Sequence, residues 1–145
     1  MLYWTEWGTS ARIEKASMDG SGRATIHSAN IERPYSLVID IDSQVLYWAD
    51  YTLDRIESSS VNGTNRQVLT TSEVPQIFSL SMFGNMLYFS DWTYGVRQVD
   101  RFSGGTPTTI SNNFCDFISA YGLRIISQQL QPQGIDVTLA LRFFS

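Results

Sequence analysis

The stretch Leu46–Asp50, which reads LYWAD, has a close copy on each side of it in the chain. Leu2–Glu6 reads LYWTE and Leu87–Asp91 reads LYFSD, so the copies follow one another at intervals of 44 and 41 residues. Self-similarity at a fixed period of about 20 to 50 residues is typical of proteins that stack one structural unit repeatedly. The fold is therefore expected to consist of one unit repeated along the chain.

A second element keeps the same period. Tyr35–Ile39 (YSLVI), Phe78–Met82 (FSLSM) and Tyr121–Ile125 (YGLRI) share an aromatic residue, a small residue, a leucine and a final Ile or Met, at a spacing of 43 residues. A third element has the same period, because Arg12–Glu14 (RIE) returns 43 residues later as Arg55–Glu57 (RIE). Three independent features thus define one repeat.

The repeated elements have the character of β-strands. They are short, rich in aromatic and β-branched residues, and separated by Gly, Asn, Asp and Ser. Asp19-Gly20, Asn62-Gly63 and the matching Ser103–Gly105 suit tight hairpins that require positive φ. Stretches such as 45–48 and 77–83 carry apolar residues on both alternating faces, which predicts sheets covered on both sides.

A period near 43 residues with four short strands is the size of one blade of a β-propeller. The predicted fold class is all-β, a partial propeller of about three four-stranded blades. The strand order is circularly shifted: residues 2–28 supply the second, third and fourth strands of one blade, and two full blades follow. Residues 121–126 then supply a final first strand.

Composition excludes several classes of function. The 145 residues carry a net charge of -4 and no run of Lys or Arg, so nucleic acid is not an expected partner. No apolar stretch approaches the roughly 18 residues that span a bilayer. Cys115 is the single cysteine, which excludes an internal disulfide and a multi-thiolate zinc site, and its neighbours Phe114 and Phe117 favour a buried thiol. No metal site is predicted, since a calcium site would have no contiguous loop motif.

These residues resemble the YWTD, or class B, repeats of the low-density lipoprotein receptor and receptor-related proteins, which form six-bladed propellers. The motif residues are Tyr3, Trp4, Thr5, Glu6, Tyr47, Trp48, Asp50, Tyr88, Phe89 and Asp91. The resemblance covers residues 1–133, in repeats of about 2–45, 46–86 and 87–133, and leaves a tail, 134–145, without a match. The departures from the motif, such as Glu6 in place of Asp, keep approximate size or charge.

The resemblance implies that the final strand completes the N-terminal blade, but a closed ring of three blades would be smaller than the usual four to eight. Two explanations stay open. Further blades belong upstream, or two half-propellers associate into one ring. We favour the first, because Met1 directly precedes a strand and no signal peptide is present.

Repetition of the motif itself argues for a structural role. The repeated aromatic residues are expected to fill the space between blades, and Glu6, Asp50 and Asp91 to bond to backbone at strand ends. Binding residues are expected where the units differ. Trp7, Tyr51 and Trp92 directly follow the motif and could form an aromatic patch of interface anchors, or instead cap the core at the rim.

Five further residues are weaker candidates. Arg33, Tyr35 and Asp40 lie near the start and end of a first strand that should line the central channel, and we predict partner contacts there. Asn62-Gly63-Thr64 is an acceptor sequence for N-glycosylation on a predicted hairpin, although it could equally occur by chance. In the resembling receptors histidines help release ligand at acidic pH, but an exposed, functionless His27 in an outer strand is the favoured interpretation.

Catalysis has little support in the residues. With one histidine, one cysteine and no Gly-x-Ser-x-Gly motif, neither a Ser-His-Asp nor a Cys-His arrangement is indicated, and no cofactor is predicted. The resemblance implies instead a protein-binding segment of a receptor on the extracellular side of the plasma membrane, for endocytosis of ligands or Wnt-type signalling. Nidogen-like basement-membrane adhesion is the alternative, and a propeller hydrolase the weaker one.

The resemblance also implies the surroundings of the chain. Its partners would be extracellular proteins and adjacent epidermal-growth-factor-like modules of the parent protein. Attachment to the membrane would come only from an anchor elsewhere in that parent.

Overall fold

The computed structural model describes residues 1–71, 76–111, 123–124 and 140–141, and it is all-β over these residues. The first sheet contains β1 (Leu2–Glu6), β2 (Arg12–Ala16) and β3 (Ala24–His27). The second contains β4 (Pro34–Asp40), β5 (Val45–Asp50), β6 (Arg55–Ser60) and β7 (Gln67–Thr70). The third contains β8 (Ile77–Phe83), β9 (Met86–Asp91), β10 (Gly95–Asp100) and β11 (Gly104–Ser111). Neighbouring strands within each sheet are antiparallel and consecutive in the chain, which confirms the predicted propeller-type fold class.

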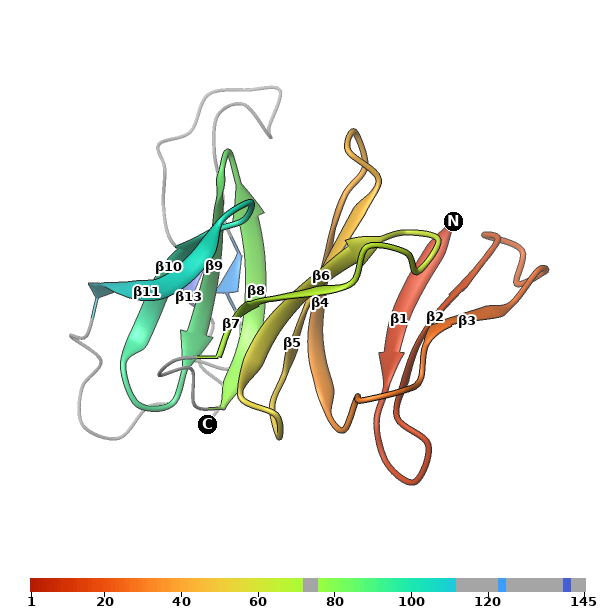
Figure 1. Ribbon diagram of the computed structural model, residues 1–145, viewed down its shortest axis with the longest axis horizontal. Helices are drawn as coiled ribbons and strands as arrows, with labels where there is room; N and C mark the ends of the chain where they lie inside the picture. The colour runs from red at the N-terminus through yellow and green to blue at the C-terminus, as the bar shows by residue number, and fades with distance from the viewer. Residues whose placement is uncertain (72–75, 112–122, 125–139, 142–145) are drawn as a thin grey trace.

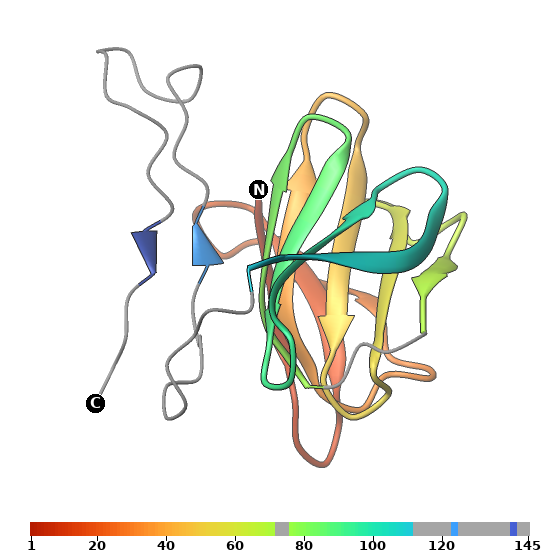
Figure 2. The same ribbon diagram turned by 90° about the vertical axis from the view of Figure 1, so that its left-hand side faces the viewer.

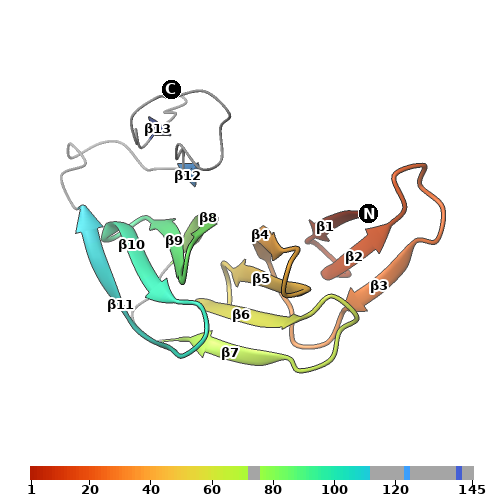
Figure 3. The ribbon, with the colours of Figure 1, turned by 90° about the horizontal axis from the view of Figure 1, so that it is seen from above.

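The three sheets stand side by side in an arc (Figure 1; Figure 3). In the view from above, β4 and β8 lie on the inner side of the arc, whereas β3, β7 and β11 lie along its outer side (Figure 3). Contacts between sheets join β1 to β4 and β4 to β8 on the inner side, and β7 to β11 on the outer side. The strands that begin the second and third sheets therefore line the concave side of the arc.

Glycines make the hairpins that sequence patterning predicts. Gly20 and Gly63 have φ of 83° and 88°, and Gly104 has φ of 65°, values that side chains with a Cβ adopt at a cost. Gly104 has a second reason to lack a side chain. An added Cβ would lie 2.1 Å from the carbonyl oxygen of Leu69, because the β10–β11 hairpin closes directly on β7.

Apolar side chains fill both spaces between the sheets. Between the first and second sheets, Trp48 and Leu46 of β5 pack with Ile13 and Ile31, all at or below 8% exposed. Tyr47 and Ala49 alternate with them along β5 and point the other way, into a cluster with Phe89 and Leu87 of the third sheet. A strand whose two faces are both buried must be apolar at successive positions, which is why LYWA replaces the usual alternation.

A cation lies over the motif aromatic residue of each sheet. The Arg66 guanidinium is 5.3 Å from the ring of Trp48, and the Arg23 guanidinium is 5.3 Å from the ring of Trp4. In the third sheet the corresponding separation, between Arg97 and Phe89, is 5.9 Å. Arg23 and Arg66 precede the last strand of their sheets, whereas Arg97 lies in β10 opposite Phe89, at the position that Glu14 and Glu57 occupy in the other two sheets, so the cation over the ring comes from a different strand in the third sheet.

The cation of the second sheet also ties two sheets together. Arg66 donates to the carbonyl oxygens of Ala29 and Asn30 at 2.6 and 2.8 Å, and Arg55 donates to Asn30 at 2.8 Å. Both arginines pair with the buried Glu57. In the first sheet the equivalent Arg12 and Arg23 pair with Glu14 and Glu6, and their side chains are 34% and 53% exposed, against 21% for Arg55 and Arg66.

The strand expected over 121–126 is described at Leu123–Arg124, which form β12. It pairs with β13 (Ala140–Leu141), which lies in the tail without a family match, and not with the first sheet. β12 and β13 lie to one side of the stacked sheets, and β12 is near β8 and β9 (Figure 2). The predicted burial of Cys115 falls outside the described residues. Within the described part of the chain, no helix is long and apolar enough to cross a membrane.

Candidate functional site

Six side chains form a continuous strip across one end of the three sheets. We call this the aromatic strip; its members are Trp7, Arg33, Tyr35, Tyr51, Phe78 and Trp92. At the end nearest the first sheet, the Arg33 guanidinium lies 4.9 Å from the ring of Trp7 and 5.4 Å from the ring of Tyr51. Arg33 thereby links an aromatic residue of the first sheet to one of the second.

The strip continues from the second sheet to the third through aromatic contacts. Tyr51 lies 5.8 Å from Tyr35 and 5.6 Å from Phe78, measured between ring centroids. Phe78 contacts Tyr35 edge to face at 5.9 Å and Trp92 at 5.5 Å. These tilted and edge-to-face separations are favourable for aromatic pairs. The three residues that follow the motif, Trp7, Tyr51 and Trp92, are thus brought into one line.

The strip exposes large apolar surface to solvent. Trp7 is 58% exposed, Trp92 55% and Tyr35 43%, whereas Phe78 beneath them is 8% exposed. Large aromatic side chains rarely stay this exposed side by side unless the patch has an interaction to make. Neither exposed indole belongs to the two buried clusters between the sheets, although Trp92 contacts the buried Phe78.

Asp50 fixes the backbone that carries the strip. This fully buried carboxylate accepts the N–H groups of Glu32 and Arg33 at 2.9 and 3.1 Å and those of Thr52 and Leu53 at 3.1 Å. The N–H of Tyr51 in turn donates to the carbonyl of Arg33 at 2.8 Å. Two strip residues from different segments are consequently held by one acid.

The other two motif acids differ from each other. Asp91 accepts the N–H groups of Thr93 and Tyr94 at 2.8 and 2.5 Å, and burial raises the pKa of its carboxyl. Glu6 was expected to bond to backbone as well, but its described bonds go to side chains: Arg12 at 2.5 Å, Arg23 at 2.8 Å and the indole N–H of Trp4 at 3.2 Å. The additional methylene of Glu carries the carboxylate past the turn, so that prediction is wrong for Glu6.

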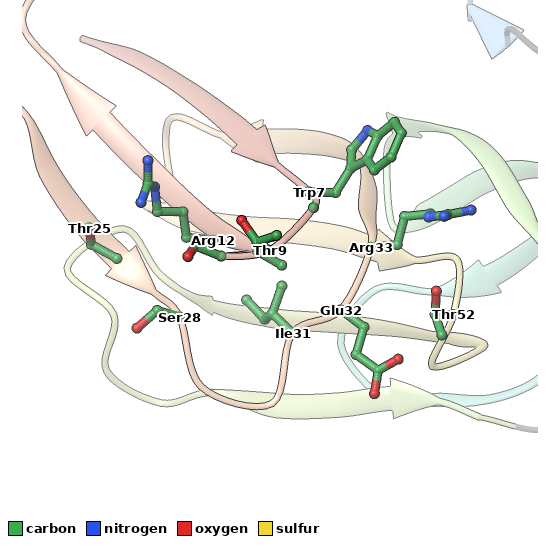
Figure 4. Close-up of a pocket in the computed structure, with 12 residues that line it drawn as sticks. Trp7, Thr9, Arg12, Thr25, Ser28, Ile31, Glu32, Arg33 and Thr52 are labelled. Atoms are coloured by element: carbon green, nitrogen blue, oxygen red, sulfur yellow. The ribbon is translucent and has the colours of Figure 1, made fainter.

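A groove of about 780 Å³ opens beside the strip, between the first and second sheets (Figure 4). Arg33 and Trp7 line it on the side of the strip, and Ile31 lies at its apolar part. Its other lining residues are mostly small or hydroxylated: Gly8, Thr9, Ser10, Ala11, Arg12, Thr25, Ser28, Glu32 and Thr52. The groove therefore offers many hydrogen-bonding hydroxyls next to exposed rings.

Asp40 does not reach this end of the molecule. It ends β4, whereas Tyr35 lies near its start, and its carboxylate forms an ion pair with Arg101 of the third sheet and accepts the N–H groups of Asp42 and Ser43. The Arg101 hydrogen bond lowers the pKa of Asp40 to about 2. The described contacts of Asp40 thus join two sheets at the end opposite the strip.

Asn62 is exposed at the β6–β7 hairpin, also at the end opposite the strip. Its side-chain oxygen accepts the N–H of Thr64 at 3.0 Å and the Thr64 hydroxyl at 2.7 Å. Asp19 accepts from Ser21 with the same two distances in the first sheet. The turn itself therefore requires an Asp or Asn there, and a glycan on Asn62 would leave the strip uncovered.

His27 is buried, so the favoured interpretation of an exposed residue is wrong. Its Nε2 lies 2.8 Å from the hydroxyl of Ser59, and its ring lies 5.1 Å from that of Trp48. Desolvation and the nearby positive charge of Arg66 lower the pKa of His27. The second sheet covers this outer strand, which the sequence of the strand alone does not reveal.

Phe78 is the strip residue that the sequence analysis did not select. Its position in the repeat corresponds to that of Tyr35, 43 residues earlier, so extending that candidate by one period would have found it. In the described residues, no three His, Cys, Asp or Glu side chains gather in a way that could hold a metal ion.

Comparison with known proteins points to one family. A family model described as low-density lipoprotein receptor repeat class B matches residues 1–41. The vitellogenin receptor of Solenopsis invicta is 36% identical over 104 residues, which cover 71% of this chain and 6% of that receptor. The low-density lipoprotein receptor-related protein 5-like protein of Homo sapiens is 32% identical over 102 residues, or 70% of this chain and 40% of that protein.

A solved structure agrees with the sequence relatives. A chain in the crystal structure of a nidogen/laminin complex matches with a TM-score of 0.65 and 29% identity, covering 74% of this chain and 42% of its own length. The present chain thus spans well under two thirds of the relatives and of the structure that it matches.

Proposed function

Because this chain belongs to the YWTD-type β-propellers built from low-density lipoprotein receptor class B repeats, we propose that it is a protein-binding segment of an extracellular receptor. Its partners are extracellular proteins, which dock on the aromatic strip. The chain acts through recognition and catalyses no reaction. In the parent protein it lies on the extracellular side of the plasma membrane, beside epidermal-growth-factor-like modules, and any attachment to the membrane comes from an anchor elsewhere in that parent.

The aromatic strip is the observation that carries this proposal. Interface anchors are enriched in Trp, Tyr and Arg because these side chains bury much area while losing few rotatable bonds. In the strip, all three types contact one another before any partner arrives, and Asp50 fixes the backbone of Arg33 beneath them. Because these side chains are already ordered, they lose little conformational entropy when a partner binds, which favours a stable complex.

The weaker hydrolase alternative would have to use His27, the single histidine, with Ser59 as the nearby hydroxyl. Both side chains are buried between the first and second sheets, at 8% and 2% exposed, so a substrate does not reach them. The Ser59 hydroxyl also donates to the carbonyl of Ser60 at 3.0 Å. This pair supports packing of the two sheets better than nucleophilic attack.

The relatives favour a receptor over a matrix protein. The vitellogenin receptor and the low-density lipoprotein receptor-related proteins that the chain matches are receptors or receptor-related proteins by name, which supports ligand uptake or Wnt-type signalling at the cell surface. The nidogen/laminin structure supports the second candidate, adhesion within a basement membrane. Both candidate functions require a protein partner on the propeller, so the aromatic strip is a suitable docking surface for either of them.

Biolayer interferometry with vitellogenin and with laminin as separate probes tests the proposal. We expect the folded chain to bind one of them, and the double variant Trp7→Ala, Trp92→Ala to bind at least about tenfold more weakly, as for interface anchors. Phe102→Ala is the matched control, because Phe102 is 57% exposed in the β10–β11 hairpin at the opposite end. Unchanged binding by the double variant, or no binding of either probe by the folded chain, would count against the proposal.

A further inference from the structure

Arg33 differs from the other arginines whose side chains the structure describes in the group that its guanidinium contacts. Six arginines have a carboxylate oxygen within 3.9 Å: Arg12, Arg23, Arg55, Arg66, Arg97 and Arg101. For Arg33, no carboxylate among residues 1–71 and 76–111 lies at ion-pair distance, and its guanidinium contacts the rings of Trp7 and Tyr51 instead. Within the described part of the chain, the strip thus contains a guanidinium that pairs with aromatic rings and with no carboxylate.

The cation is also held in place. The backbone N–H of Arg33 donates to both oxygens of Asp50, at 3.1 and 3.3 Å, and its carbonyl accepts the N–H of Tyr51. Two aromatic rings restrict the guanidinium itself. Because a guanidinium directs its N–H groups outward in its own plane, stacking against rings leaves those donors available. A carboxylate would find them already oriented.

The surroundings of Arg33 narrow the class of ligand. Exposed rings on one side suit an apolar side chain, and the hydroxyl-lined groove on the other suits the polar backbone of a peptide (Figure 4). A polyanion such as nucleic acid or a sulfated glycan is disfavoured, because the neighbouring Glu32 is exposed and the chain has a net charge of -4. The single guanidinium of Arg33 suits a ligand that carries a single carboxylate.

We propose that Arg33 binds an Asp or Glu side chain of the docked protein, within an extended segment whose adjacent apolar side chain lies on the aromatic strip. This inference rests on the proposed function and specifies the partner at that same site. The segment follows the groove between the first and second sheets, where Thr9, Ser10 and Thr52 are placed to bond to its backbone. Arg33 then provides specificity for Asp or Glu over Asn or Gln, and the aromatic rings provide affinity.

A library of random heptapeptides, selected on the immobilised chain, tests this inference. We expect selected sequences to carry Asp or Glu beside an aromatic or aliphatic residue. On the Arg33→Gln variant the apolar preference should persist and the acid preference should disappear. Arg23→Gln is the matched control, because Arg23 is exposed, stacks on Trp4 and lies outside the strip. Circular dichroism of each variant confirms that it is folded.

Calorimetry then measures one selected peptide and its Asn or Gln counterpart. On the wild-type chain, we expect loss of the carboxylate to weaken binding at least tenfold, and on Arg33→Gln less than twofold. Peptides that require Trp7 but show no acid preference would overturn the inference and leave the proposed function intact. Peptides that bind regardless of Trp7→Ala and Trp92→Ala, or no enrichment on the folded chain, would contradict both.

Discussion

The carboxylate of Asp50 accepts the backbone N–H of Arg33, although Arg33 precedes β4 and Asp50 is the last residue of β5. The same carboxylate holds Thr52 and Leu53, so one acid fixes both sides of Tyr51 and its partner Arg33. The motif acid is therefore structural in its contacts, and it nevertheless determines the geometry of the candidate binding site.

Replacing Asp50 should affect stability and binding together. Asp50→Ala leaves four backbone N–H groups without their acceptor, so we expect the free energy of unfolding to fall by about 3 kcal/mol or more. Urea denaturation measures this change, and Asp42→Ala, at an exposed position, should change it by less than about 0.5 kcal/mol. Equal effects of the two substitutions would show that the Asp50 bonds contribute little.

Trp48 and Trp4 occupy the same repeat position with different surroundings. Trp48 is fully buried between two sheets, so Trp48→Ala should cost about 3 to 5 kcal/mol of stability. Trp4 is partly exposed on the outer face of the first sheet, and Trp4→Ala should cost less than half as much. Chemical denaturation of both variants makes the comparison, and a larger cost at Trp4 would contradict the sheet order described above.

Gly104 should tolerate a methyl group poorly. Both Gly104 and Gly84 have positive φ, 65° and 57°, but an added Cβ at Gly104 meets the Leu69 carbonyl, whereas at Gly84 it meets nothing within 4 Å. Gly84→Ala should therefore show only the backbone cost of about 1 kcal/mol, and Gly104→Ala at least twice that. The urea midpoints of the two variants measure this difference in stability. Similar midpoints would mean that the β10–β11 hairpin can move away from β7 to accommodate the methyl group.

Acid should loosen the contact between the first two sheets through His27. Its pKa is lowered in the folded state, so the unfolded chain takes up the proton first as the pH falls below about 6.5. The stability that neutral His27 provides is present above that pH and is lost as the pH falls. The groups facing it are Ser59, Trp48, Arg66 and Glu57.

Thermal unfolding at pH 7.5 and pH 5.5 measures this effect. We expect the wild-type chain to unfold at a lower temperature at pH 5.5, and His27→Gln to show a smaller difference between the two pH values. The variant keeps every carboxyl, including Asp91 with its raised pKa, so a smaller difference in the variant belongs to His27. An unchanged difference in the variant would assign the acid sensitivity to other groups.

Period and strand pattern predicted most of the fold because each repeat supplies the same local information. LYWTE forms β1, LYWAD lies in β5 and LYFSD lies in β9, and the glycine hairpins lie where the turn residues indicated. The clustering of Trp7, Tyr51 and Trp92 also follows from equal positions in equal units. Arg33 and Tyr35 were candidates from their place near the start of a strand, but the pattern did not predict that Arg33 stacks on Trp7 and Tyr51, and it left out Phe78, which joins Tyr51 to Trp92.

Three sequence-based predictions, for Asp40, His27 and Glu6, differ from the structure. Asp40 was grouped with Tyr35 because both belong to one strand, but strand residues advance about 3.3 Å each, so five positions separate the two by about 16 Å. His27 lies in an outer strand, and its burial depends on the neighbouring second sheet. Glu6 illustrates a third case, since one methylene redirects a motif acid from backbone to arginine side chains.

The unequal covering of the two motif tryptophans has a consequence for how the chain opens. Stacked repeats behave approximately as a one-dimensional series in which each unit is stabilised by its immediate neighbours. Packing on both faces stabilises the second sheet, because Trp48 packs toward the first sheet and Tyr47 toward the third. The first sheet packs against one described neighbour. Amide hydrogens of β5 and β6 should accordingly exchange with solvent far more slowly than those of β1 and β2, so the chain opens from the first sheet inward.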